Sequence, residues 1–437
     1  MNEFPKDFLW GVSTSSAQIE GAYLEDGRSM SIWDDIPKGK IKNDSDSHIA
    51  CDHYHKFKED IEIMKKIGVK SYRFSLSWSR IIPEEGKINE KGIAFYNSLI
   101  DELIKNNIEP IVTLYHWDLP LWIEKNYNGW LNKKIVSLFE EYTKVVITYF
   151  SDRVKYWLTF NEPQCFLLNG YITSAHAPFK RVIFRFSRII KNFLLANKVS
   201  VDTIRKYAKK PPMISLSFGS GAYIPKVEND KKSIEEARYK SFYKGMGTIN
   251  NRLFFDPIIL GKGVHSYLIY RVSNKFAKKI KVNLDFLAIN NYEAFNYSPF
   301  GNGKINKTNL KTNSLGWVID GRTLYYTSKF IYERYKLPIM ITENGMCDND
   351  VIINNKVNDV KRIKFIDEYL FNVKKAINDG INIIGYHYWS LLDNFEWAEG
   401  YLPRFGLVYV DYKTLNRTMK ESAYHYSEII KNNGKDL

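Results

Sequence analysis

The sequence contains little cysteine, and its spacing indicates neither a disulfide framework nor a metal site. Only Cys51, Cys165 and Cys347 occur in 437 residues, without any CxxC pair or Cys/His spacing typical of zinc. Widely separated cysteines in odd number argue against a disulfide-stapled fold and fit free thiols in a reducing compartment. We therefore expect free thiols, no metal and no cofactor.

Long apolar runs are also missing. No stretch approaches the roughly 20 residues that span a bilayer, and residues 1–7 contain no hydrophobic segment of a signal peptide. We therefore expect a cytoplasmic protein without a membrane partner. The net charge of +14 would suit nucleic acid, but the lysines are scattered over Lys/Asn/Ile-rich segments. We interpret the charge as compositional bias and expect no nucleic-acid partner.

Apolar, β-branched runs are abundant and alternate with segments of helical periodicity. The expected strands are Phe8–Ser13, Val69–Trp78, Pro110–Trp117, Tyr156–Glu162, Met213–Phe218, Asp285–Asn290, Pro338–Thr342 and Ile383–Trp389. The expected helices are His53–Ile67 with Gly68 as its C-cap, Gly92–Asn106, Lys133–Phe150, Asn192–Tyr207 and Val360–Asp379. The glycine-rich phosphate turn of a doubly wound sheet is absent. The pattern predicts an α/β fold, a single (β/α)8 TIM barrel, with residues 1–437 as one catalytic domain.

Two of the expected strands end in a carboxylate beside an amide. Asn161 and Glu162 precede Pro163, which must end its strand because proline lacks the backbone N–H. Glu343 and Asn344 end the strand that begins at Pro338. In a barrel these ends meet on one rim, so we expect the two glutamates to face one cleft.

Two carboxyl groups on one rim, with 15% aromatic residues and no metal ligands, favour glycoside hydrolysis. One carboxyl would donate a proton to the leaving oxygen, and the other would attack the anomeric carbon or activate water. Arg73 should point into the barrel and keep Glu343 ionised, whereas Glu162 follows an aromatic-apolar strand and could stay protonated. The alternative is that both glutamates are ordinary rim residues in ion pairs.

An ordered set of motifs from Phe4 to about Tyr426 resembles glycoside hydrolase family 1, the retaining β-glucosidases and β-galactosidases. The motifs are Phe8-Leu9-Trp10-Gly11, Gln18-Ile19-Glu20-Gly21, Ser31-Ile32-Trp33-Asp34, Tyr72-Arg73-Phe74-Ser75, Tyr115-His116-Trp117-Asp118, Thr159-Phe160-Asn161-Glu162-Pro163, Ile341-Thr342-Glu343-Asn344-Gly345 and Asp393-Asn394-Phe395-Glu396-Trp397. The resemblance implies that Glu162 is the general acid/base and Glu343 the nucleophile, with the carboxyl groups about 5–5.5 Å apart.

The resemblance also implies roles for polar and aromatic side chains around the two glutamates. Tyr292 would orient Glu343, with Asn290 beside it, and Trp389 would form the floor under the sugar ring. The expected sugar-contacting residues are Gln18, His116, Trp117, Asn161, Trp317, Trp389, Glu396, Trp397 and Phe405. We expect Trp78 and Trp157 to pack in the core instead.

Glu396 indicates the class of sugar. Family members that act on 6-phosphosugars usually carry Ser there, followed by Lys and Tyr phosphate ligands, whereas this chain continues Glu396-Trp397-Ala398-Glu399. The resemblance therefore implies an unphosphorylated β-glucoside, with galactosides and fucosides as secondary substrates. A 6-phospho-β-glycosidase and a non-catalytic sugar-binding relative remain the alternatives, and the sequence indicates no oligomeric state.

Three features depart from the family pattern or stand outside it. Asn291 and Gln164 each stand where the family usually has an aromatic residue. The spans 257–285 and 293–317 are shorter than usual in the family, so we expect an open flank beside the sixth strand. Residues 179–191 interleave cations with apolar side chains. This stretch is typical of a barrel helix with a solvated basic face, and the alternative is a helix on an anionic surface.

Overall fold

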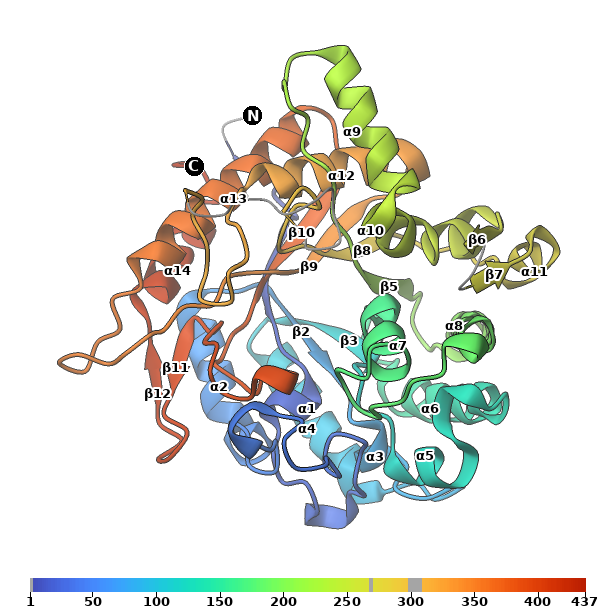
Figure 1. Cartoon of the computed structure of the whole chain (residues 1–437). Helices are drawn as coiled ribbons and strands as arrows, with labels where there is room; N and C mark the ends of the chain where they lie inside the picture. The colour runs from blue at the N-terminus through green and yellow to red at the C-terminus, as the bar shows by residue number, and fades with distance from the viewer. Residues whose placement is uncertain (1–2, 267–269, 298–308) are drawn as a thin grey trace.

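The computed structural model describes residues 3–266, 270–297 and 309–437. Eight parallel strands close into a barrel in the order β1-β10-β9-β8-β5-β4-β3-β2, and Figure 1 shows the helices arranged around them. β1 pairs with β10 from Leu9–Gly385 to Ser13–Trp389, so the two ends of the chain close the barrel together. The predicted TIM barrel is confirmed.

All eight expected strands are present in the barrel. They are β1 (Leu9–Ser13), β2 (Ser71–Ser75), β3 (Glu109–Tyr115), β4 (Tyr156–Asn161), β5 (Met213–Gly219), β8 (Leu287–Asn290), β9 (Ile339–Asn344) and β10 (Ile383–Trp389). Outside the barrel, β6 (Val264–Ser266) pairs with β7 (Tyr270–Val272), and β11 (Val408–Val410) with β12 (Arg417–Met419). The second barrel strand ends earlier than expected, because Trp78 begins the short helix α3 (Trp78–Ile81).

The expected helices are present, α2 with the expected bounds and the other four with shifted ends. The other helices of the described residues are α1 (Ser16–Ile19), α2 (His53–Ile67), α4 (Glu90–Lys105), α5 (Leu121–Tyr127), α6 (Lys134–Phe150), α7 (Pro163–Tyr171), α8 (Phe186–Tyr207), α9 (Lys231–Tyr243), α10 (Gly245–Gly247), α11 (Asn274–Ile280), α12 (Arg322–Tyr335), α13 (Val360–Asn378) and α14 (Glu421–Lys431). Gly68 ends α2 with φ +83°, the left-handed conformation that glycine adopts without steric cost.

The apolar core has two layers, and their placement leaves one end of the barrel free for polar groups. The larger layer lies between strands and helices, and both Trp78 and Trp157 are buried in it, as expected. The smaller layer fills the barrel near the amino ends of the strands with Ile111, Leu158 and Met340, among others. Above it, Arg73, Thr113 and Ser217 occupy the interior. The polar site therefore rests on a packed apolar plug.

The basic stretch 179–191 is only partly helical. Residues 183–185 form a 3-10 turn with Phe184 fully exposed, and α8 begins at Phe186, six residues before the expected start. Phe186, Ile189 and Ile190 are buried against the barrel. The second half of the stretch is thus a barrel helix with a solvated basic face. In the described residues no helix combines the length and apolarity needed to cross a membrane.

The region around the sixth barrel strand contains short elements. Between β5 and β8 lie α9, α10, two π-helical turns, the β6–β7 hairpin and α11. Part of the span 293–317 lies outside the described residues. The open flank therefore stays a prediction.

Candidate active site

Glu162 stands at the junction between β4 and α7. Its φ of +42° lies in the left-handed region, and Pro163 occupies the first position of α7, where its missing N–H is tolerated. A non-glycine residue with positive φ is uncommon, and such backbone strain clusters at functional sites. This conformation ends the strand and turns the Glu162 carboxyl into the barrel mouth. Glu162 as a whole residue is 8% exposed there.

Glu343, near the end of β9, is held by two donors. The guanidinium of Arg73 forms an ion pair with Oε1, and the hydroxyl of Tyr292 donates to Oε2 at 2.8 Å. Arg73 is fully buried and donates through Nε to Thr113 Oγ1 at 3.0 Å and through Nη2 to Asn161 Oδ1 at 2.8 Å. Its position is thus fixed by β3 and β4 before it reaches Glu343.

Asn290 contacts the other glutamate. Its Nδ2 donates to Glu162 Oε1 at 2.8 Å and to Asn161 Oδ1 at 3.0 Å, while its Oδ1 accepts from Thr342 Oγ1 at 2.7 Å. In register it lies opposite Glu343 on β9, as expected, but its side chain turns toward Glu162. Asn161 therefore connects both halves of the site, since it accepts from Arg73 and from Asn290.

The two carboxyl groups differ in their electrostatic surroundings. Burial raises the pKa of Glu343 to about 7, the charge of Glu162 adds to this, and Arg73 and Tyr292 oppose it. Burial also raises the pKa of Glu162, opposed mainly by the Cys165 thiol and the Asn290 amide. Among the residues that the structure describes, the Arg73 cation is bonded to Glu343 and no cation is bonded to Glu162. Because charge-assisted hydrogen bonds favour the ionised form, the negative charge of the pair is better stabilised on Glu343.

His116 and Trp117 close the same side of the mouth. The His116 Nε2 lies 3.0 Å from Asn161 Nδ2, and burial beside Arg73 holds the pKa of His116 well below its usual value. The His116 imidazole is therefore neutral, and its Nε2 accepts a hydrogen bond from the Asn161 side-chain amide. Trp117, with φ +76°, donates through Nε1 to the Asn161 carbonyl at 2.9 Å. Both residues thus surround Asn161.

Gln18 and Glu396 meet through the loop after β10. Gln18 Nε2 donates at 2.9 Å to both Asn394 Oδ1 and the Phe395 carbonyl, so it holds this loop. Glu396 Oε1 accepts from Trp389 Nε1 at 3.3 Å. Burial raises the pKa of Glu396 to about 8, and the charge of Glu343 contributes to the rise.

Aromatic rings line the mouth. Trp397 packs on Trp117 with ring centroids 4.7 Å apart. Trp389 and Phe405 form a small cluster with Cys347, against which Tyr292 and Trp317 pack. Trp317 lies 5.6 Å from the Tyr292 ring and 6.0 Å from the Phe405 ring. The structure therefore brings all the expected site residues to one end of the barrel.

Sequence reasoning missed the small side chains that hold the larger ones. Thr113 and Thr342 bind Arg73 and Asn290, and Ser217 Oγ lies 3.4 Å from Arg73 Nη2. Cys165 was expected only as a free thiol, yet it contacts Glu162. The sequence signal that could have indicated Thr113 and Thr342 is a hydroxyl side chain inside an otherwise apolar strand, close to the carboxyl end of that strand.

A closed (β/α)8 barrel with two buried carboxyl groups, one bonded to arginine and the other to an amide, defines a glycoside hydrolase site. The chain belongs to glycosyl hydrolase family 1, whose model matches residues 1–435. The predicted family and enzyme class are thereby confirmed. In residues 3–266, 270–297 and 309–437, no group of three or more His, Cys, Asp or Glu side chains is arranged to hold a metal ion.

Two curated relatives and one solved structure illustrate the similarity. The chain is 41% identical over 451 aligned residues to a 1,4-beta-D-glucan glucohydrolase of Thermotoga neapolitana, with 99% of each chain covered. It is 40% identical to Beta-glucosidase A of Thermotoga maritima, again with 99% of each covered. A beta-glucosidase structure from Thermotoga maritima in complex with glucoimidazole superposes with a TM-score of 0.91, at 39% identity, covering 99% of this chain and 100% of that one.

Proposed function

We propose that this glycoside hydrolase cleaves terminal, non-reducing β-D-glucosyl residues with retention of configuration. The observation that carries the proposal is the unequal bonding of two glutamates in one buried network. Glu343 is bonded to the Arg73 cation and the Tyr292 hydroxyl, whereas Glu162 accepts from the neutral Asn290 amide. Such a division separates a nucleophile from an acid.

In the proposed mechanism each glutamate has one role in each of two steps. Glu343 attacks the anomeric carbon while Glu162 gives its proton to the leaving glycosidic oxygen, so that a covalent glycosyl-enzyme forms and the aglycone leaves as an alcohol. Glu162, now ionised, then takes a proton from water, which attacks the same carbon and releases Glu343. The two inversions give overall retention.

Sugar recognition is assigned to the polar and aromatic groups of the mouth. A neutral polyol is bound by convergent amide, imidazole and carboxyl groups, and its C–H face packs on an aromatic plane. We assign hydroxyl contacts to Gln18, His116, Asn161, Glu396 and Trp397, and the floor to Trp389. Trp117, Trp317 and Phe405 complete the walls, with Trp317 on the aglycone side.

The glucoside preference is supported by the printed names of the Thermotoga relatives and by the glucoimidazole complex. β-Galactosides and β-fucosides are proposed as secondary substrates. A 6-phospho-β-glycosidase is disfavoured because Glu396 supplies no positive charge for a phosphate, whether ionised or protonated. A non-catalytic binding role is disfavoured because both glutamates are present.

We also propose that residues 1–437 form one catalytic domain, since β1 and β10 must pair to close the barrel. A cytoplasmic location is proposed as well, because free thiols such as the three cysteines here fit a reducing compartment.

The decisive experiment compares 4-nitrophenyl β-glucoside, β-galactoside and 6-phospho-β-glucoside as substrates of the wild type. We expect hydrolysis of the first, weaker hydrolysis of the second and none of the third. Proton NMR of the first-formed sugar should show the β-anomer. Hydrolysis of the phosphorylated substrate alone, or a first-formed α-anomer, would contradict the proposal.

A further inference from the structure

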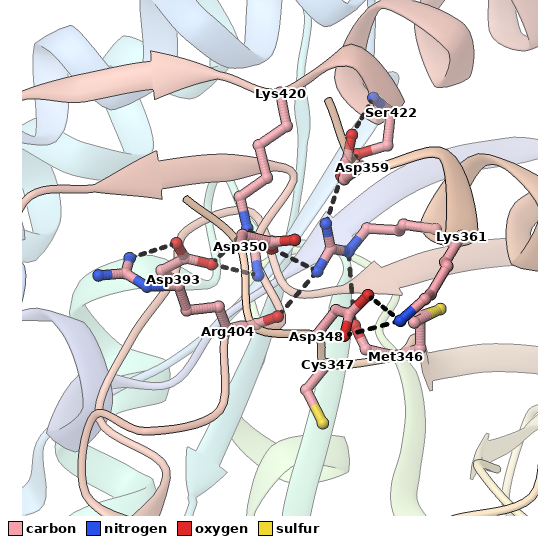
Figure 2. A network of polar contacts seen from close by, with 12 residues as sticks. Met346, Cys347, Asp348, Asp350, Asp359, Lys361, Asp393, Arg404, Lys420 and Ser422 are labelled. Atoms are coloured by element: carbon pink, nitrogen blue, oxygen red, sulfur yellow. Dashed lines mark hydrogen bonds and ion pairs between the residues drawn. The ribbon is translucent and has the colours of Figure 1, made fainter. Parts of the chain in front are cut away.

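Figure 2 shows a network of charged side chains in which Lys420 lies between Asp350, from the loop after β9, and Asp393, from the loop after β10. The charge network consists of Asp350, Asp359, Arg362, Asp393, Arg404 and Lys420. The side chains of Arg362, Asp393 and Lys420 are fully buried. Three cations and three carboxylates thus balance one another.

Asp393 closes the loop after β10 on itself. Its Oδ1 accepts from the backbone N–H of Gly406 at 2.9 Å and from Lys420 Nζ at 2.7 Å, while its Oδ2 accepts from Arg404 Nη1 at 2.6 Å. The enclosed loop carries Glu396. One carboxylate therefore holds together both ends of the segment 393–406.

Asp350 belongs to the loop that follows β9. It accepts from Lys420 Nζ at 2.5 Å and from Arg362 Nη2 at 2.6 Å. Arg362 also donates to the Arg404 carbonyl at 2.8 Å and forms an ion pair with Asp359. The strand β9 carries Glu343, so this part of the network is continuous with the proposed nucleophile.

Lys420 and Arg362 both join the two loops. Arg362 bonds to Asp350 and to the Arg404 carbonyl, whereas the Lys420 ammonium bonds to the two carboxylates Asp350 and Asp393 together. Lys420 directly precedes α14, which gives it a rigid base. Burying ions is expensive, and well-packed apolar side chains of the same volume often stabilise a protein equally well. A network of this kind is therefore better explained by a need for one defined arrangement of the loops than by stability.

Few hydrogen bonds hold the Glu396 side chain in place. Its carboxyl accepts from Trp389 Nε1 at 3.3 Å, a long contact, and from the Asn394 side chain. Its backbone N–H donates to Gly400 within the same loop at 2.7 Å. The position of Glu396 relative to Glu343 consequently depends on how the whole loop is held.

We propose that Lys420 is a positioning residue for sugar recognition, which sets the distance between Glu396 and Glu343 by bridging Asp393 and Asp350. The inference rests on the proposed function, in which Glu396 contacts sugar hydroxyls, and it assigns to Glu396 the 4- and 6-hydroxyls. Lys420 acts through these carboxylates and does not touch substrate. Its loss should therefore weaken binding of sugars that reach Glu396 with a 6-hydroxyl, and spare those that lack it.

The test compares K420M with the wild type on 4-nitrophenyl β-D-glucoside and β-D-xyloside, since xylose lacks the hydroxymethyl group at C5. We expect KM for the glucoside to rise on the order of tenfold, which matches the loss of one hydrogen bond to a charged group, with kcat changed less than about threefold. KM for the xyloside should change less than about threefold. Titration with a slow 2-fluoroglucosyl substrate gives the active fraction.

R334M is the matched control. Arg334 donates to both oxygens of buried Asp256 at 2.9 and 2.7 Å, where α12 leads into the amino end of β9, opposite the mouth. We expect R334M to lower the melting temperature while leaving the ratio of kcat/KM values for glucoside and xyloside unchanged. A ratio altered equally in R334M would show a general packing effect and would overturn the proposal.

The remaining outcomes are also decisive. If K420M keeps the wild-type ratio of the two kcat/KM values per active site, Lys420 is not a positioning residue. Should K420M not accumulate as folded protein, D350N takes its place, because it keeps the shape and removes one of the two carboxylates bound to Lys420. An unchanged ratio in D350N would then overturn the proposal. Failure of the proposed function can be told apart from an unchanged ratio in K420M or D350N, because in that case the wild type itself would not hydrolyse the glucoside.

Discussion

The ends of β4 and β9 are alike in sequence and different in chemistry. Each ends in an amide next to a glutamate, Asn161-Glu162 and Glu343-Asn344. Yet Arg73 and Tyr292 bond to one glutamate, and Asn290 bonds to the other. The end of a strand thus places a carboxyl group, whereas side chains from neighbouring strands decide which of its protonation states is favoured.

Removing Glu343 should have the largest effect. We expect E343G to lower kcat on 4-nitrophenyl β-glucoside by about 10⁴-fold or more, because no covalent intermediate can form. Azide should restore turnover by giving the α-glucosyl azide, which NMR identifies. E109Q, at the amino end of β3, is the control and should retain wild-type kcat. Full activity of E343G would refute the assignment.

Removing Glu162 should depend on the leaving group. We expect E162A to lower kcat/KM about 10³-fold for an alkyl glucoside, and far less for 2,4-dinitrophenyl β-glucoside, whose leaving group needs no proton. The measurement is the slope of log kcat/KM against leaving-group pKa. A uniform loss across the series would argue that Glu162 is not the acid.

Y292F tests the nucleophile side of the comparison. The Tyr292 hydroxyl favours ionised Glu343, so its removal raises the pKa of Glu343, which burial already raises to about 7. Ionised Glu343 is needed, so activity is lost as pH falls through this pKa, and the acidic limb of kcat/KM should move to higher pH. We expect about a 10-fold loss at neutral pH. An unshifted acidic limb would contradict this.

N290A tests the acid side and should have the smallest effect. The Asn290 amide favours ionised Glu162, so its removal raises the pKa of Glu162 further. Protonated Glu162 is needed, so activity is lost as pH rises through this pKa, and the basic limb should move to higher pH. We expect about a 3- to 10-fold loss near the optimum. The two limbs are macroscopic values of the coupled pair, so the contrast between N290A and Y292F is what decides.

The barrel was predictable because its pattern is local. Each strand is a short apolar run bounded by helical periodicity, and eight such runs without a linker leave few alternatives. Strand and helix ends were less predictable. Trp78 fits a strand by composition but begins α3, and α8 extends to Phe186, because burial against neighbouring elements decides where periodicity stops.

The site was predictable in its chemistry and less in its contacts. Polar residues at strand ends indicated the rim, and the motifs around Glu162 and Glu343 indicated the family. The turn of Asn290 toward Glu162 was not readable, nor was the attachment of Gln18 to the loop at Asn394. Both contacts join residues more than 100 positions apart, and sequence spacing carries no information about such pairs.

By itself, the sequence determined which strands form the barrel, which family the chain resembles and which two carboxyl groups lie on its rim, because hydrophobic period and short motifs are properties of neighbouring residues. Only the tertiary structure decided that the Asn290 amide bonds to Glu162, that Thr113 and Asn161 hold Arg73, and that Lys420 bridges Asp350 and Asp393. The physical reason is that charge and hydrogen bonding act over a few ångströms in space, and closing the barrel determines which distant side chains come that near.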